Sequence, residues 1–363
     1  MANLFVVFTP LQVVIAQQII RQEKLSDCVM LASYWEGYAH FWDIYEMTII
    51  DDMWAKVLFF QDWARWDYEG IGLLKNSLKV RKRYRQIKKI LVENKIDTIY
   101  LADFQNQTNR FSCFLFAHQG YKIVFYEEGY SHYVPRKSYP PSQSFLHKVY
   151  QELIDLTYYL PLYHIKFAEW RCWPNKDYHG LPIHLRYSIL PNCHHEKYDR
   201  LLKCETMIST KLKSFVSEEL QSIGIQSIIL LTDPMSEVLP KQYRYLYFEV
   251  INEILDQYSG YSICVKFHPR EKENDRKEIM NLLKEKEINY TILGKRINIP
   301  VEFYLQYHSF KKVLFFNTST YFYNGYLFPK VQFVKLLPSL YEKCRKSKAT
   351  DLEQMEGLLK FIG

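Results

Sequence analysis

The sequence predicts an α/β fold in which two Rossmann-like domains face a central cleft. The chain has 363 residues, more than one ordinary domain, and 48% of them are apolar, enough for a large core. Short apolar runs typical of buried strands alternate with helical patterns, and this alternation occurs in each half of the chain. Two open sheets in tandem leave a cleft at the carboxyl ends of their strands, where ligands of such folds bind.

Residues 1–160 are expected to form the N-terminal domain. Their apolar runs predict strands at residues 4–8, 28–32, 57–60, 98–102 and 122–126. Helical patterns predict helices at residues 11–21, 71–94 and 106–118. This order indicates a parallel sheet with helices on both faces.

The alternation is interrupted over residues 161–200, which we interpret as a connection between the domains. The residues that break regular structure there are Pro161, Pro174, Gly180, Pro182 and Pro191. The alternation resumes in a second domain, residues 201–345. Its predicted strands are 227–231, 262–266 and 313–316, and its predicted helices are 243–257 and 275–286. The C-terminal segment, residues 346–363, is expected to contain a short amphipathic helix.

The composition restricts the partners and the compartment. The formal net charge of +7 favours anionic partners such as phosphates, nucleotide sugars or an acidic membrane surface, and no nucleic-acid-binding motif is found. The seven cysteines include no C-x-x-C pair, which favours a reduced cytoplasmic protein. We find no signal peptide, and no apolar run reaches the roughly 18 residues of a spanning helix. The oligomeric state stays open, a homodimer included.

The sharpest motif combines a histidine with positive charge at the end of a predicted strand. Lys266, His268, Pro269 and Arg270 form a K-x-H-P-R sequence. Pro269 keeps His268 out of the following helix, so the imidazole is held at the strand's carboxyl end. Lys266 and Arg270 add positive charge suited to a phosphate. The alternative is a His-Pro pair that only turns the chain.

Two carboxylate motifs are candidates for a general base. Glu127, Glu128 and Gly129 follow a predicted strand, and one of the two carboxylates could face the cleft while the glycine permits a tight exit. A carboxylate there could take a proton from a hydroxyl group. Asp233, which follows the first strand of the second domain, competes for this role. An acidic surface turn and a capping aspartate are the structural alternatives.

Hydroxyl-bearing residues follow two further strands. Thr318, Ser319 and Thr320 could bind phosphate or carboxylate oxygens at a helix start, or could simply cap the helix. Thr9 and Pro10 have a complete structural explanation as the cap and first residue of a helix. A binding role for Thr9 or for Gln12 depends on position alone.

Residues 74–91 form a strongly basic helical segment. It carries Lys75, Lys79, Arg81, Lys82, Arg83, Arg85, Lys88 and Lys89. The segment is either a solvated basic face or a site of peripheral docking on the anionic inner membrane leaflet. No D-x-D motif is present to hold a metal ion, and the cluster Cys193-His194-His195-Glu196 lacks the spaced second pair of a zinc site.

These motifs together resemble those of the bacterial sialyltransferases, which share a D/E-D/E-G motif, an HP motif and a later Ser/Thr motif on a GT-B fold. The N-terminal F-T-P-L-Q…I-A-Q run is most similar to the lipooligosaccharide sialyltransferases of glycosyltransferase family 52. The resemblance implies an N-terminal acceptor-side domain and a C-terminal CMP-donor domain. It implies that Glu127 is the base, and that His268 contacts the CMP phosphate and helps the leaving group depart. Either Thr318 and Ser319, or Ser319 and Thr320, match the paired hydroxyls.

The implied function is inverting transfer of sialic acid from CMP-sialic acid to a hydroxyl group of a bacterial surface glycan, a lipooligosaccharide or a capsule. No cofactor is expected, because one phosphate can be neutralised by protein groups without a divalent ion. Two alternatives stay open. One is transfer of another CMP-activated nonulosonic acid or Kdo, and the other is non-catalytic binding of a nucleotide or glycan during polysaccharide assembly.

Overall fold

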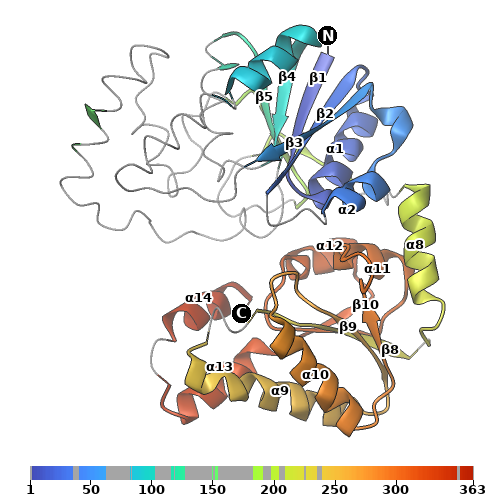
Figure 1. Ribbon diagram of the computed structural model, residues 1–363, viewed down its shortest axis with the longest axis vertical. Coiled ribbons are helices and arrows are strands. Elements are labelled where there is room, and N and C mark those ends of the chain that lie inside the picture. Colours follow the sequence, from blue (N-terminus) through green and yellow to red (C-terminus); the bar gives the residue numbers. More distant parts are fainter. Residues whose placement is uncertain are drawn as a thin grey trace. The chain divides into compact units, whose positions relative to one another are not determined.

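The computed structural model of the chain contains two compact units, Met1–Ser209 and Thr210–Gly363, each of which is described by itself (Figure 1). The residues described are 2–35, 41–62, 82, 84–102, 116–117, 119–126, 149, 152–153, 183–190, 198–203, 209–224, 226–234, 239–349 and 352–362. Both units are parallel sheets with helices, so the predicted α/β class is confirmed.

The described part of the first unit contains a seven-stranded parallel sheet with the order β3-β2-β1-β4-β5-β6-β7. The strands are β1 (Ala2–Val7), β2 (Cys28–Trp35), β3 (Lys56–Asp62), β4 (Ile96–Leu101), β5 (Lys122–Tyr126), β6 (Leu185–Ser188) and β7 (Arg200–Leu201). The helices that the structure bounds are α1 (Pro10–Glu23), α2 (Phe41–Thr48) and the 3₁₀ helix η2 (Asp51–Met53). Residues 84–93 are also helical.

One apolar core cluster of the first unit lies where the central strands meet the helical residues 84–93. Leu4 and Val6 of β1 pack in one apolar cluster with Tyr84, Ile87 and Leu91. The spacing of the last three residues places them on one face of the helix. Burying each large apolar side chain contributes about 2 kcal/mol, so this face fixes the helix on the sheet.

One strand, β6, lies inside the segment that we expected to connect the domains, and another, β7, crosses its end. β6 pairs with β5, and β7 pairs with β6, so residues 185–188 and 200–201 extend the first sheet. The compact units divide later in the chain, between Ser209 and Thr210. Strands of four and two residues are too short to give an apolar pattern among prolines.

The second unit contains a five-stranded parallel sheet among its described residues, with the order β10-β9-β8-β11-β12. The strands are β8 (Ser227–Leu231), β9 (Ser262–Lys266), β10 (Tyr290–Leu293), β11 (Lys312–Phe315) and β12 (Gln332–Lys335). The α-helices are α8 (Thr210–Leu220), α9 (Arg244–Gln257), α10 (Glu273–Glu285), α11 (Val301–Tyr307), α12 (Asn324–Leu327), α13 (Leu337–Lys346) and α14 (Glu353–Ile362). Two 3₁₀ helices are η6 (Lys241–Tyr243) and η7 (Ser319–Tyr323).

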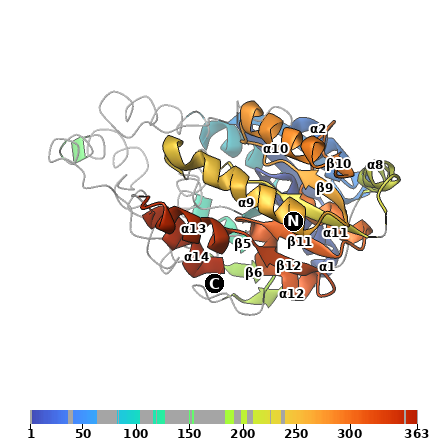
Figure 2. The same ribbon diagram turned by 90° about the horizontal axis from the view of Figure 1, so that it is seen from below.

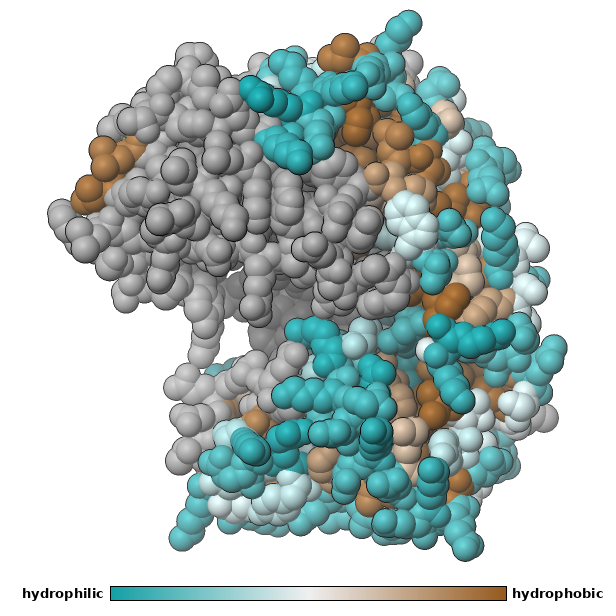
Figure 3. Space-filling model, viewed as in Figure 1, coloured by the Kyte–Doolittle hydropathy of each residue, from teal (hydrophilic) through white to brown (hydrophobic). Residues whose placement is uncertain are grey.

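Helices cover both faces of this second sheet. α9, α10 and α13 lie side by side on one face, whereas α11 and α12 lie on the other (Figures 1 and 2). All five residues of β8 are buried, as expected for a central strand covered on both faces. In the view of Figure 3, the described surface of this unit is mostly hydrophilic.

Buried thiols lie in both units. Cys28 opens β2, Cys264 lies in β9, and Cys344 lies in α13, and all three are free and buried. Burial raises the pKa of Cys28 to about 11 and that of Cys264 to about 12.

Among the described residues, no helix is both long enough and apolar enough to cross a membrane.

Candidate functional site

Three loops meet at one edge of the second sheet because its strands are parallel. β9, β8 and β11 are neighbours in that order, and their carboxyl ends lead into His268, Asp233 and Thr318. The chain changes direction across the sheet between β8 and β11, which is the position where open α/β sheets bind ligands. The fold thus brings three of the predicted motifs together.

His268 is held by two hydrogen bonds, one at its backbone N–H and one at its ring. Its backbone N–H donates to Thr232 Oγ1 over 3.2 Å. Its ring atom Nδ1 accepts from the backbone N–H of Arg270 over 3.1 Å. Because Nδ1 is an acceptor, the proton of the neutral ring lies on Nε2. His268 therefore offers one N–H donor at the sheet edge.

The imidazole of His268 is neutral at physiological pH. Burial lowers its pKa to about 4, and the nearby cations Arg270, Lys266 and Arg276 contribute to the lowering. Arg276 also braces the loop, since its Nη2 donates to the His268 carbonyl oxygen over 3.1 Å. A neutral N–H donor among cations suits an anionic oxygen.

Lys266 points into the protein instead of into solvent. Its side chain is buried, and Nζ donates to Asn298 Oδ1. Burial lowers the pKa of Lys266 to about 8, opposed mainly by the negative charge of Glu302. Asn298 Nδ2 in turn donates to the Phe267 carbonyl oxygen over 3.4 Å. Lys266 thus supports the His268 loop from the protein interior, through Asn298. Pro269 and Arg270, in contrast, are exposed.

Asp233 lies at the exit of β8 and is 8% exposed. Its backbone N–H donates to the hydroxyl of buried Tyr247 over 3.3 Å. Its neighbour Thr232 donates through Oγ1 to Glu271 Oε2. Burial raises the pKa of Glu271 to about 7. The exits of β8 and β9 thus share a buried polar network.

The hydroxyls after β11 have unequal environments. Thr318 caps η7, and its Oγ1 accepts from the Thr320 backbone N–H over 3.3 Å. Thr320 is 1% exposed, and its Oγ1 donates to Glu302 Oε1 over 2.7 Å. The Thr320 hydroxyl is therefore committed to the protein interior. The Thr318 hydroxyl is also bonded within the protein, since it donates to Thr320 Oγ1 over 3.0 Å. The Ser319 side chain lies outside the described residues, so which two hydroxyls form the pair stays a prediction.

Asn317, just before this turn, carries an amide oxygen of a different kind. Its Oδ1 is buried and has no hydrogen-bond partner among the described residues. Buried acceptors of this kind are rare, because leaving one unsatisfied costs about 1–3 kcal/mol. Asn317 is therefore a further polar group at the same edge of the sheet.

The motif after β1 has a structural explanation in the first unit. Thr9 caps α1 by accepting from the Gln12 backbone N–H over 3.3 Å, and Pro10 occupies the first turn. Gln12 is 1% exposed, and its Oε1 accepts from the Phe8 backbone N–H over 2.6 Å. The side chains of Thr9 and Gln12 thus hold the strand-to-helix turn.

The E-E-G motif follows the last residue of β5, Tyr126, in the sequence. Glu127, Glu128 and Gly129 themselves lie outside the described residues, and so does the cluster Cys193-His194-His195-Glu196. Among the residues that are described, no group of three or more His, Cys, Asp or Glu side chains could hold a metal ion.

Sequence reasoning missed several residues of this edge. Glu271 is part of the K-x-H-P-R-E run and Thr232 directly precedes Asp233, so both had a signal in their neighbours. Asn298 and Glu302 had none, because they reach Lys266 and Thr320 only through the fold. Glu302 is buried on the short helix α11, and in the sequence such a residue looks like a solvated one.

Comparisons with solved structures support the fold. The chain is similar to the α/β-galactoside α-2,3-sialyltransferase of Photobacterium phosphoreum, with 12% identity, a TM-score of 0.50 and 92% and 89% of the two chains covered. It also matches UDP-GlcNAc 2-epimerase of Neisseria meningitidis, with 11% identity, a TM-score of 0.49 and 99% and 94% covered. E. coli ADP-heptose LPS heptosyltransferase II matches with 10% identity, a TM-score of 0.43 and 96% and 100% covered. The match to the Photobacterium phosphoreum enzyme confirms the predicted GT-B fold.

The sequence itself gives the identification. No curated protein matches it. The family profile of the alpha-2,8-polysialyltransferases (POLYST) matches residues 3–336 and so includes both sheets. The predicted sialyltransferase resemblance is confirmed, whereas the finer likeness to glycosyltransferase family 52 is not. The chain therefore belongs to the alpha-2,8-polysialyltransferase family, whose donor is CMP-sialic acid.

Proposed function

We propose that the protein is an inverting sialyltransferase that moves sialic acid from CMP-sialic acid to a hydroxyl group of a bacterial surface glycan, a lipooligosaccharide or a capsule. The family name adds a linkage, because an α-2,8 bond is made by O8 of an acceptor sialic acid. We therefore expect the acceptor glycan to end in sialic acid.

The observation that carries this proposal is the neutral His268 with its proton on Nε2. A CMP donor has one phosphate, and His268 would donate this N–H to a phosphate oxygen. The exposed cation of Arg270 after β9 and the start of η7 at Thr318 after β11 add positive potential on the two sides of the β8 exit. These groups stabilise the negative charge that the phosphate gains as it leaves.

The chemical step is a single displacement at the anomeric carbon of the donor. The acceptor oxygen forms a bond to C2 of the sialic acid while the bond from C2 to the phosphate oxygen breaks. CMP leaves with the electron pair of that bond, and the acceptor proton passes to a carboxylate. We assign this carboxylate to Glu127, with Asp233 as the alternative.

A direct assay of CMP release tests the proposal. The protein is mixed with CMP-sialic acid and either a sialylated oligosaccharide or an unsialylated galactoside, with and without EDTA. We expect CMP release with the sialylated acceptor and no effect of EDTA, because the single phosphate is met by protein donors. The absence of CMP release with both acceptors contradicts sialyl transfer. Loss of activity in EDTA that Mg²⁺ or Mn²⁺ restores contradicts metal-independent phosphate binding.

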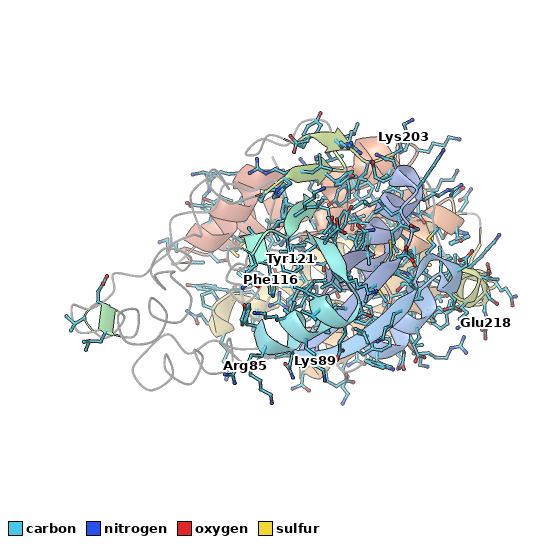
Figure 4. All side chains as sticks on the ribbon, turned by 90° about the horizontal axis from the view of Figure 1, so that it is seen from above. Arg85, Lys89, Phe116, Tyr121, Lys203 and Glu218 are labelled. Carbon is cyan, nitrogen blue, oxygen red and sulfur yellow. The ribbon has the colours of Figure 1, made fainter. Side chains whose placement is uncertain are left out.

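We also propose a cytoplasmic protein that docks peripherally on the anionic inner membrane leaflet. The described helix at residues 84–93 buries one face, whereas Arg85, Lys88 and Lys89 are exposed. Figure 4 shows Arg85 and Lys89 pointing outward, on the side away from Phe116 and Tyr121. Val92 adds an apolar group that is 63% exposed. Basic and apolar groups together suit an anionic lipid surface.

A further inference from the structure

A buried carboxylate, Glu271, lies behind the exits of β8 and β9. It is 5% exposed, and its own backbone N–H donates to the His268 carbonyl oxygen over 3.0 Å. Its Oε2 accepts from Thr232 Oγ1. The same Oγ1 accepts the His268 backbone N–H over 3.2 Å. Glu271 is therefore joined to His268 both directly and through one hydroxyl group.

The second oxygen of Glu271 faces the other exit loop. Oε1 accepts from the Tyr247 hydroxyl over 3.5 Å. That hydroxyl accepts the Asp233 backbone N–H over 3.3 Å. The two exit loops that carry His268 and Asp233 are thus connected through a single carboxylate.

Burying the Glu271 carboxylate in this network costs folding free energy. Removing a carboxylate from water is unfavourable, and burial raises the pKa of Glu271 to about 7. The hydrogen bond from Thr232 and the positive charge of Arg276 only partly offset the effect of burial on this pKa, and the negative charge of Asp275 adds to that effect. An apolar residue would fill the same space without this penalty. A fully bonded buried network instead fixes the geometry of the groups it holds.

We propose that Glu271 is a positioning residue for sialyl transfer, which holds the backbone of His268 through Thr232 and that of Asp233 through Tyr247. The inference rests on the proposed function. The Thr232 hydroxyl can donate one hydrogen bond, and Glu271 accepts it. This bond directs a lone pair of Oγ1 toward the His268 N–H, so the imidazole keeps its place at the sheet edge.

Two matched pairs of variants separate this role from simple packing. Thr232→Val keeps the shape without the hydroxyl, whereas Thr232→Ser keeps the hydroxyl. Glu271→Leu removes the acceptor, whereas Glu271→Gln keeps an oxygen for Thr232. We expect Thr232→Val and Glu271→Leu to lower kcat/KM for CMP-sialic acid by about tenfold to a hundredfold. The Ser and Gln variants should stay within about threefold of wild type.

A double-mutant cycle with His268→Ala identifies the path of the effect. If Thr232 acts through His268, adding Thr232→Val to His268→Ala should cost almost nothing further. If the two losses in kcat/KM multiply, Thr232→Val has only loosened the fold, and the proposal is wrong. A Thr232→Val enzyme with wild-type kcat/KM would also overturn it. Should Glu271→Leu fail to fold, the Thr232 pair decides.

Binding distinguishes this inference from the proposed function. Calorimetry compares CMP with cytidine, which lacks the phosphate. Thr232→Val should weaken CMP binding while cytidine binding stays unchanged, whether or not the wild-type enzyme transfers sialic acid. A wild-type protein that binds CMP without transfer would contradict the proposed function alone. Equal CMP affinity in wild type and Thr232→Val would contradict the positioning role alone.

Discussion

His268 illustrates how local structure sets the chemistry of a side chain. A histidine with its ordinary pKa would be partly charged near neutral pH, but burial lowers the pKa of His268 to about 4. The backbone N–H of Arg270 occupies Nδ1, so the neutral ring can act only as a donor through Nε2. A neutral His268 is thus suited to hydrogen bonding with a phosphate oxygen, the role that we propose for it.

Substitution and pH together test this role. His268→Ala should lower kcat by about tenfold to a hundredfold with little change in Tm. His268→Gln supplies an amide N–H and should retain more activity. The ratio of wild-type to Ala kcat/KM should stay constant between about pH 5 and 8. It should fall only as the pH drops toward 4, because protonation of Nδ1 removes the acceptor for the Arg270 N–H that holds the ring. A ratio that declines as the pH rises toward 8 would show that the protonated ring is required.

The sequence predicted candidate residues where reactive side chains stand at the end of an apolar run. Lys266 is the last residue of β9 and His268 follows two residues later, so this pattern is visible without knowledge of the fold. The direction of each side chain was not predictable. Lys266 turns to Asn298, and Thr320 turns to Glu302, through contacts between segments distant in the sequence.

Among the secondary-structure elements, the helix at residues 84–93 has the clearest consequence outside the site. Its exposed positive charges should bind vesicles that contain anionic lipid. Replacing Arg85, Lys88 and Lys89 with Gln should weaken this binding on the order of a hundredfold, because each charge near the surface contributes about 1 kcal/mol. Vesicle cosedimentation measures the effect, with neutral vesicles as the baseline.

The control for vesicle binding removes charge elsewhere. Lys211 and Lys213 are exposed on α8, and their replacement with Gln should leave vesicle binding nearly unchanged. An equal loss in both variants would show that net charge alone matters, and the assignment to residues 84–93 would then be wrong.

The sequence predicted central strands better than edge strands. β8 and β9 lie at their predicted positions because their apolar runs are continuous and buried. β10 and β12 were missed, since most of their residues are only partly buried. The helices α8 and α13 were missed as well. Short strands at the margins of a sheet form because a neighbour pairs with them, so their sequences carry little signal.

At the scale of the whole molecule, the two candidates for the general base lie in different units. Glu127 belongs to the first and Asp233 to the second. We favour Glu127, since the N-terminal domain of a GT-B transferase usually holds the acceptor. Glu127→Gln should lower transfer by roughly 10² to 10⁴ while CMP affinity stays near wild type. Asp233→Asn is the matched comparison in steady-state kinetics. If Asp233→Asn abolishes transfer and Glu127→Gln does not, the assignment reverses.

The buried thiols of Cys28 and Cys264 give each unit its own reporter of opening. A thiol must be deprotonated and reachable to be alkylated, and burial prevents both at neutral pH. Each of these two cysteines can therefore react only when its own sheet opens, Cys28 with the first and Cys264 with the second. The rate at which each one is alkylated in the native protein thus measures the opening free energy of one unit independently of the other.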